Sequence, residues 1–185
     1  FTLILPYYNE SKSVNFTLSK LQNLKKPPTE ILFINSKSSD DSSKKIDEFI
    51  KKNNLKKWKN YNTNLETPSE AKNFGIMNSN YEWCAFMDFD LNFDRYWTED
   101  QIKKIKINSD KKIFFGQILL SPTFFLDKLI IAQTWGLNRK SPVIPSSFIN
   151  KEYFSINGLF LPVRSYYDKL FIEKSRKSKE TFINQ

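Results

Sequence analysis

Two aspartates, Asp88 and Asp90, follow the apolar residues 83–87 with one residue between them. A continuous apolar run of this length predicts a strand that is buried on both faces. Residues two apart in an extended chain point the same way, so both carboxylates can reach one point beyond the end of the strand. They would repel each other without a cation, and Mn²⁺ or Mg²⁺ binds carboxylates together with phosphate oxygens. The pair therefore indicates a metal that binds a phosphate-bearing ligand, unless it is only an Asp-rich turn that ends a core strand.

The composition excludes several kinds of site. The 185 residues fit one domain and include no His, which removes His-based acid–base catalysis, Ser-His triads and His-ligated zinc. The single Cys84 cannot form an internal disulfide, and we expect a small, buried core residue there. The chain begins at Phe1, inside an apolar run, and this leaves open that it is part of a longer protein.

The net charge of +9 points to anionic partners. Only four of the 29 basic residues are Arg, the residue on which base readout relies, so we do not expect a nucleic-acid partner. A solvated Lys-rich surface explains most of the charge, and a phospholipid surface or a phosphate-bearing substrate are the further alternatives. No apolar stretch approaches the roughly 20 residues of a membrane span. We expect a cytoplasmic protein, with peripheral contact at the inner face of the membrane as an extension of that prediction.

Strands and helices are predicted to alternate over residues 1–120, which favours an open α/β sheet flanked by helices. Ligands of such sheets bind where the strands end, and Asn9-Glu10, Asn35-Ser36 and Asp88-Asp90 all follow strands. The predicted strands are residues 1–5, 30–34, 57–61 at an edge, 83–87 and 113–120, and the predicted helices are residues 11–25, 42–50, 68–77 and 98–107.

Residues 121–185 show a less regular pattern. We predict a helix over residues 124–135, a Pro- and Ser-bearing loop over 138–148, a strand over 154–163 with Gly158 inside it, and a solvated basic tail over 174–179. The loop is of a kind that can close over a site or simply connect two elements, and connectors are commoner.

Four segments resemble, in order and spacing, the motifs of family 2 glycosyltransferases, the nucleotide-sugar enzymes of the GT-A fold. Residues 3–10 are similar to the opening strand with its P-x-Y-N-E turn, and residues 30–40 to the strand that ends in D-D-G-S-x-D. Residues 72–76 resemble the R-N-x-G helix, and residues 87–90 the D-x-D motif. The resemblance implies a single GT-A domain over residues 1–185 with an open mixed sheet. Residues 1–120 would be its nucleotide-sugar-binding half and 121–185 its acceptor half.

The resemblance also implies roles for the first two motifs. Tyr8 would stack on a uracil-type base with the Pro6 backbone beside it, and Asn9 and Glu10 would complete this part of the donor site. Ser36 stands where the family has the Asp that accepts a hydrogen bond from the base, so any pairing there would be uncharged. Ordinary packing at a strand end is the alternative reading of Tyr8.

The third and fourth motifs would handle the diphosphate. Lys72 would neutralise phosphate or orient the base, and the alternative interpretation is an ordinary lysine on a solvated helix face. Asn73 would fix the helix at the donor. Asp88 would reach the ribose or a metal-bound water, and Asp90 would ligate Mn²⁺ or Mg²⁺ directly. Such a metal stabilises the charge that builds on the leaving group.

The sequence departs from the family at two places. Asn35 and Ser36 replace paired aspartates, and Lys37 replaces a Gly whose role is to take a positive φ. The E-D pair that supplies the base of inverting members is absent, and Glu180, followed by Thr181, occupies about its place. Glu180 is therefore the candidate base. Two alternatives stay open: another residue is the base, or this protein is catalytically impaired.

The leading hypothesis is a metal-dependent, inverting hexosyltransferase of polysaccharide biosynthesis. It would move a sugar from a nucleoside diphosphate, most simply a UDP-sugar, to a glycan or lipid-linked acceptor. The first alternative is a catalytically silent GT-A domain that binds a glycan or a partner. A nucleotidyltransferase is weaker, because four Gly residues cannot build its phosphate loop. A nucleic-acid binder would need a steep salt dependence without a metal.

Overall fold

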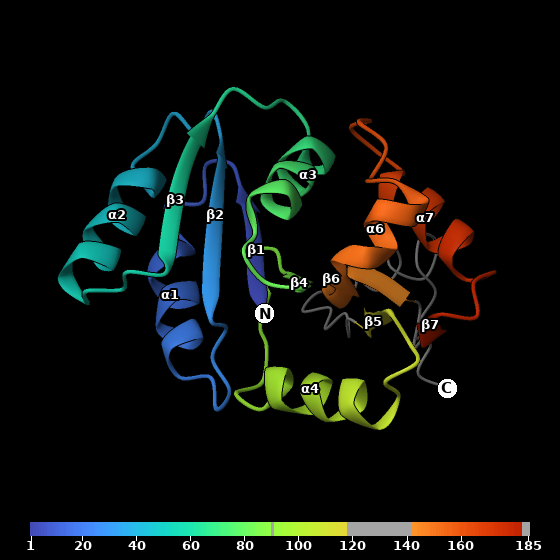
Figure 1. Ribbon diagram of the computed structural model, residues 1–185. Helices are drawn as coiled ribbons and strands as arrows, with labels where there is room; N and C mark the ends of the chain where they lie inside the picture. The colour runs from blue at the N-terminus through green and yellow to red at the C-terminus, as the bar shows by residue number, and fades with distance from the viewer. Residues whose placement is uncertain (90, 118–141, 183–185) are drawn as a thin grey trace, which may run out of the picture.

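The computed structural model describes residues 1–89, 91–117 and 142–182 (Figure 1). Its strands form one seven-stranded sheet in the order β3-β2-β1-β4-β6-β5-β7. All pairings are parallel except the two that β6 makes with β4 and β5. The strands are β1 Thr2–Tyr7, β2 Glu30–Ser36, β3 Trp58–Thr63, β4 Trp83–Phe86, β5 Ile113–Gln117, β6 Pro142–Asn150 and β7 Thr181–Phe182. The predicted open mixed sheet flanked by helices is confirmed.

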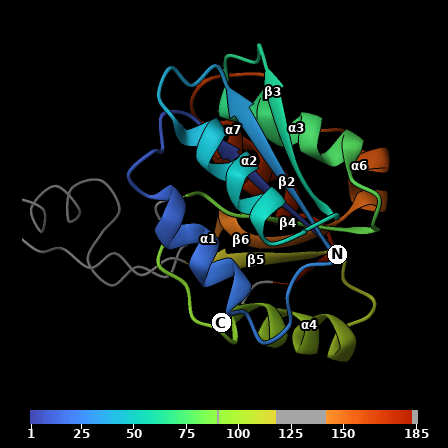
Figure 2. The same cartoon turned by 90° about the vertical axis from the view of Figure 1, so that its left-hand side faces the viewer.

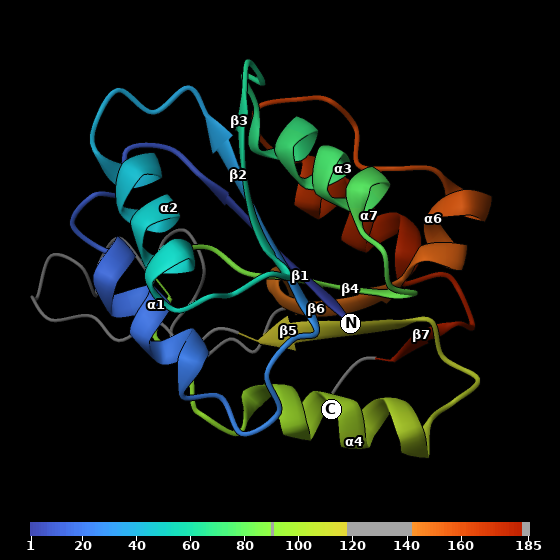
Figure 3. The ribbon, with the colours of Figure 1, turned by 60° about the vertical axis from the view of Figure 1, so that its left-hand side comes forward.

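Helices cover both faces of the sheet, as Figure 3 shows. One face packs against α1 Val14–Gln22, α2 Ser42–Lys52 and α4 Trp97–Ile107, with α4 lying beneath β5 in Figure 2. The other face packs against α3 Pro68–Asn78, α6 Lys151–Asn157 and α7 Tyr167–Ser175. Alternate residues of β1 divide between the faces, because Leu3 and Leu5 join the first core and Ile4 the second.

The first half of the chain follows its sequence pattern closely. The strands and helices predicted before residue 117 are present with small shifts at their ends, β3 is an edge strand as predicted, and Cys84 is buried. The predicted helix over residues 124–135 and the end of the predicted strand 113–120 lie outside the described residues. No helix in the described ranges is long and apolar enough to cross a membrane.

The loop predicted over residues 138–148 was wrong, because β6 begins at Pro142 and lies in the middle of the sheet. Proline cannot donate to a sheet ladder, and this made a central strand an unfavourable prediction. The structure avoids the problem with an irregularity: the β5–β6 register shifts between Phe114 and Gly116, opposite Pro145. A Cβ on Gly116 would lie 2.4 Å from the Pro145 carbonyl oxygen, so only glycine fits the bulge.

The strand predicted over residues 154–163 was also wrong. Asn150 caps α6 there by accepting a hydrogen bond from the Glu152 backbone N–H at 2.9 Å, and Gly158 ends the helix with a φ of 84°. Residues 158–166, which we call the strap, then run without regular structure to α7. Strand β6, from the predicted acceptor half, pairs with β4 and β5 of the predicted nucleotide-sugar-binding half.

A close contact between α3 and β1 gives a stability prediction. Replacing a helical Gly by Ala normally stabilises by about 0.5–1 kcal/mol. At Gly75, however, the new Cβ would lie 2.5 Å from Cγ2 of the fully buried, β-branched Ile4. We expect Gly75→Ala to destabilise by about 1–3 kcal/mol in urea unfolding. The Ile4→Ala background should reduce that loss, and equal losses in both backgrounds would contradict the clash.

Glu30, a buried carboxylate at the start of β2, gives a pH prediction. Burial alone would raise the pKa of Glu30, but hydrogen bonds from Asn80 and Thr2 outweigh it and hold the pKa below 4.5. A lowered folded-state pKa adds stability above the unfolded pKa, and this stability is lost as the pH falls through the folded value. Glu30→Gln should therefore cost about 1–3 kcal/mol at pH 7 and progressively less below pH 4.5. A deficit in chemical denaturation that does not change with pH would contradict this.

Candidate nucleotide-sugar site

A pocket of about 840 Å³ opens at the carboxyl ends of strands β1, β2 and β4. It contains six residues of the predicted site: Pro6, Tyr8, Glu10, Ser36, Lys72 and Asp88. Its other lining residues are Tyr7, Lys37, Leu65, Glu66, Thr67, Pro68, Phe89, Arg164, Ser165 and Tyr167. The strand-end topology thus brings most of the predicted residues to one place.

Lys72 carries a buried charge in the wall of this pocket. Its side chain is 2% exposed, and its Nζ lies 3.4 Å from the Asp88 carboxylate and donates to the Tyr167 hydroxyl at 3.0 Å. Burial alone would lower the pKa of Lys72, but the Asp88 charge and the Tyr167 hydroxyl hold the pKa above its ordinary value. Lys72 is therefore a fixed cation, and its alternative reading as a solvated helix residue does not hold.

Asn73 does not line the pocket but fastens the strap to α3. Its Nδ2 donates to the Phe160 carbonyl oxygen at 2.8 Å, and its Oδ1 accepts from the Phe160 N–H at 3.0 Å. One helical turn earlier, the Ser69 hydroxyl donates to the Val163 carbonyl oxygen at 2.9 Å. These bonds hold the strap, and with it the pocket wall at Arg164.

Asn9 also lies outside the pocket lining and stabilises the loop that carries Tyr8. Its φ is 56°, and its Oδ1 accepts from the Ser39 backbone N–H at 2.8 Å while its own N–H donates to the Ser38 hydroxyl at 2.9 Å. Asp40, from the same second loop, accepts from the Ser11 N–H at 3.0 Å.

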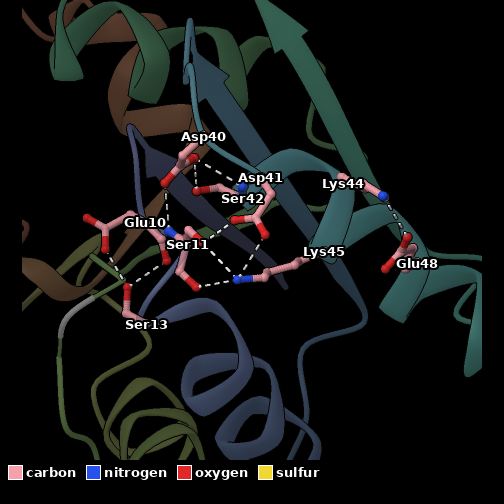
Figure 4. A network of polar contacts seen from close by, with 9 residues as sticks. All are labelled: Glu10, Ser11, Ser13, Asp40, Asp41, Ser42, Lys44, Lys45 and Glu48. Atoms are coloured by element: carbon pink, nitrogen blue, oxygen red, sulfur yellow. Dashed lines mark hydrogen bonds and ion pairs between the residues drawn. The ribbon is translucent and has the colours of Figure 1, made fainter.

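Figure 4 shows how this polar network joins the β1–α1 loop to the start of α2. Lys45 forms an ion pair with Asp41 at 3.2 Å and donates to Ser11. Hydrogen bonds from Ser42 and Ser11 overcome the effect of burial and keep the pKa of Asp40 low. The loop after β1 is thereby fixed at the pocket rim.

The departure at residues 35–37 is accommodated locally. Lys37 has a φ of 62°, so it takes the left-handed conformation for which the family uses Gly, and its Nζ lies 2.9 Å from Glu66. The Asn35 amide donates to Asn62 and accepts from the Ser38 N–H, so this side chain is engaged within the protein. Ser36 is left facing the pocket.

The carboxylate of Asp88 can take part in a metal site. Its side chain is 42% exposed and lines the pocket, and Mg²⁺ or Mn²⁺ needs only one or two carboxylates when phosphates complete the shell. Within the described ranges no group of three or more His, Cys, Asp or Glu could hold a metal on its own. Asp90 lies outside the described residues. The described residues therefore fit a metal that Asp88 would hold together with the phosphates of a ligand.

Glu180 lies away from the pocket. Its carbonyl oxygen accepts from the N–H groups of Lys112 and Ile113, at the beginning of β5, whereas Asp88 follows the end of β4. Strands β4 and β5 both run antiparallel to β6 and therefore point in the same direction. The start of β5 and the end of β4 thus lie at opposite ends of the strands. The structure does not bring Glu180 together with the other predicted site residues.

The sequence reasoning missed Arg164, Ser165 and Tyr167, which form the far wall. They belong to the strap and to the first turn of α7, between the strand predicted to end at residue 163 and the tail predicted from residue 174, where no element was predicted. Tyr167 and Phe171 are both buried and lie four residues apart, and this spacing was the available signal for the helix.

Comparison with known proteins identifies the family. The model of the family described as "Glycosyl transferase family 2" matches residues 2–139. The chain belongs to this family. The match confirms the resemblance based on the four motifs.

Among curated proteins, the chain is similar to poly-beta-1,6-N-acetyl-D-glucosamine synthase of Staphylococcus epidermidis, with 36% identity over 112 residues. It also matches an uncharacterized glycosyltransferase of Rickettsia bellii, with 31% identity over 111 residues. Each match covers 58% of this chain, but only 27% and 15% of the respective relative. The chain thus spans about a quarter or less of these relatives.

Solved structures share the GT-A fold. S. aureus TarS 1-349 in complex with UDP has a TM-score of 0.70 and 20% identity over 95% of this chain and 54% of that one. The mannosyltransferase PcManGT from Pyrobaculum calidifontis, in complex with GDP-Man and Mn²⁺, has a TM-score of 0.67 and 18% identity over 87% of this chain and 47% of that one.

The attachment of the strap can be tested with two asparagines of α3. Asn73→Ala removes both bonds to Phe160 and should cost about 1–3 kcal/mol, with faster hydrogen exchange at the Phe160 amide. Asn78→Ala is the control, because within the described part of the chain Asn78 bonds just its own helix, at the Phe74 carbonyl oxygen. Equal effects of the two variants on stability and on the Phe160 amide would show that Asn73 has no special role.

Proposed function

We propose that the chain is the donor-binding part of a metal-dependent glycosyltransferase that uses a nucleoside diphosphate sugar, a UDP-sugar of the hexose type in the first instance. The observation that carries the proposal is the pocket at the strand ends. It combines an exposed aromatic ring, three cationic side chains and the first carboxylate of the D-x-D motif.

The base of the nucleotide would lie against Tyr8. This side chain is 60% exposed and lines the pocket, so its ring is available for stacking and does not serve as core packing. Ser36 offers a neutral hydroxyl nearby, and a neutral group can donate or accept, so it sets a weaker base preference than a carboxylate would.

The diphosphate would lie between the cations. Lys72 supplies a fixed charge, Arg164 of the strap a planar donor fork, and Lys37 a third charge at the rim. Asp88 and Asp90 would hold Mn²⁺ or Mg²⁺, which when bound offsets the charge on the leaving diphosphate. Lys72 would then hold both the Asp88 carboxylate and a phosphate oxygen in place.

The acceptor would be a glycan or a lipid-linked sugar, and inversion would need a base near its hydroxyl. The described carboxylates that line the pocket are Glu10, Glu66 and Asp88. Glu66 is engaged by Lys37, and Glu10 accepts a hydrogen bond from Ser13. Glu180 lies at the opposite edge, and this favours, as a second candidate function, a silent domain that binds donor without turnover.

Calorimetric titration of UDP and of GDP, with and without Mn²⁺, tests the donor site. We expect metal-dependent UDP binding that Asp88→Asn weakens at least tenfold, because the phosphates need the metal and the metal needs this carboxylate. Lys72→Met should weaken binding similarly, and urea unfolding should show a loss of stability beside it, because the substitution leaves Asp88 and the Tyr167 hydroxyl without their partner.

The control is Asp100→Asn on α4, an exposed carboxylate outside the pocket lining, which should bind UDP like the wild type. No binding of either nucleotide under any condition would contradict the donor site. Binding with Mn²⁺, but without hydrolysis or transfer of UDP-sugars to any acceptor sugar, would support the silent domain.

A further inference from the structure

The Tyr167 hydroxyl is a buried polar group in the wall of the pocket. Tyr167 opens α7, is 8% exposed, and is among the residues that line the pocket. Its ring packs edge-on against Phe160, with the ring centroids 5.9 Å apart, and its oxygen lies 3.0 Å from Lys72 Nζ. Both ends of the side chain are therefore held, the ring by the strap and the oxygen by α3.

The hydrogen bond between Lys72 and Tyr167 runs in one direction. An ammonium group has three N–H donors and no acceptor, so the Tyr167 oxygen accepts from Lys72. Lys72 keeps its charge, because Asp88 and Tyr167 hold the pKa of Lys72 above its ordinary value. The hydrogen on the Tyr167 oxygen therefore takes no part in this bond.

Within the described part of the chain, that hydrogen has no acceptor. The hydroxyl forms one hydrogen bond there, the one from Lys72, and the nearby Asp88 carboxylate acts on it through its charge alone. Burial raises the pKa of Tyr167 although the Lys72 charge opposes it, so the hydroxyl keeps its hydrogen at neutral pH. A buried donor without an acceptor is costly, and because Tyr167 lines the pocket, a ligand there can supply the acceptor.

We propose that the Tyr167 hydroxyl is a ligand-binding group that donates its hydrogen to a phosphate oxygen of the bound nucleotide. A hydroxyl that accepts from an ammonium group is polarised and donates more strongly, and this suits an anionic acceptor. Lys72 and Arg164, cationic residues of the same pocket, favour the same kind of ligand atom. The inference rests on the proposed function, because the phosphates belong to the proposed nucleotide donor.

Calorimetric titration of UDP in the presence of Mn²⁺ tests the inference on Tyr167→Phe. The substitution keeps the ring against Phe160 and removes the hydroxyl. We expect UDP binding about tenfold weaker than in the wild type, because a hydrogen bond to a charged group is lost.

The matched control is Tyr153→Phe on α6. Tyr153 is also buried, and its hydroxyl donates to Ser175 at 3.1 Å, but it does not line the pocket. Both substitutions remove one buried hydroxyl from a ring in the same core, so they match in their effect on packing. Tyr153→Phe should bind UDP like the wild type, and an equal loss of affinity in both variants would overturn the inference.

A double-mutant cycle separates direct contact from an effect that acts through Lys72. A hydroxyl that merely positions Lys72 would make no difference once Lys72 is replaced. Direct contact predicts that Tyr167→Phe still weakens UDP binding about fivefold in the Lys72→Met background, because the hydrogen goes to the ligand and not to Lys72. No further loss in that background would contradict direct contact.

The outcomes distinguish this inference from the proposed function. Equal UDP affinities of the wild type and Tyr167→Phe would overturn the inference and leave the donor site standing. A loss that affects a UDP-sugar but not UDP would overturn it as well, because the hydroxyl would then bind the sugar. Absence of UDP binding by the wild type would overturn the proposed function, and the inference with it.

Discussion

The site depends on one buried ammonium group. Taking the charge of Lys72 out of water costs several kcal/mol, and the protein recovers this only because Asp88 and Tyr167 both lie within reach of Nζ. Asp88 follows β4, Tyr167 opens α7, and Lys72 itself belongs to α3. Three elements that are distant in the chain are thus fixed relative to one another by a single charge. The same charge faces the pocket, so under the proposed function one group would serve both structural order and ligand recognition.

Helix α3 positions Lys72 and also holds the strap, which forms the opposite wall of the pocket. Gly75 allows the helix to approach β1 closely, and this approach places Lys72 at the end of the sheet. Ser69 and Asn73 hold the strap, so the wall that contains Arg164 is also positioned from α3. The capping box formed by Thr67 and Glu70 sets where the helix begins. The pocket is therefore built by the sheet edge on one side and by groups that α3 supports on the other.

The parts of this arrangement that the sequence predicted are those with strong local signals. Buried parallel strands are continuous apolar runs, so β1, β2 and β4 and the polar residues after them could be placed from the pattern alone. The central strand β6 could not, because Pro142 and Pro145 argue against a ladder and only the partner Gly116 makes the bulge possible. The far wall was missed for a related reason. The strap has no period, and its place is determined by long-range bonds to α3 that no local pattern records.

The charges of the pocket explain why a cation would be needed there at all. Lys37 lies against Glu66 and Lys72 against Asp88, so two of the three cations already have carboxylate partners. Among the described residues, Arg164 forms no ion pair, and Glu10 adds a further negative charge to the wall. The proposed nucleoside diphosphate would bring several negative charges into this nearly balanced pocket. Breaking the Lys72–Asp88 pair to meet them would leave Asp88 facing the phosphates, and like charges in a partly desolvated pocket repel strongly. A divalent cation at Asp88 would change the sign of that contact and would leave Lys72 in place, so the charge balance of the pocket supports the proposed metal dependence beside the motif.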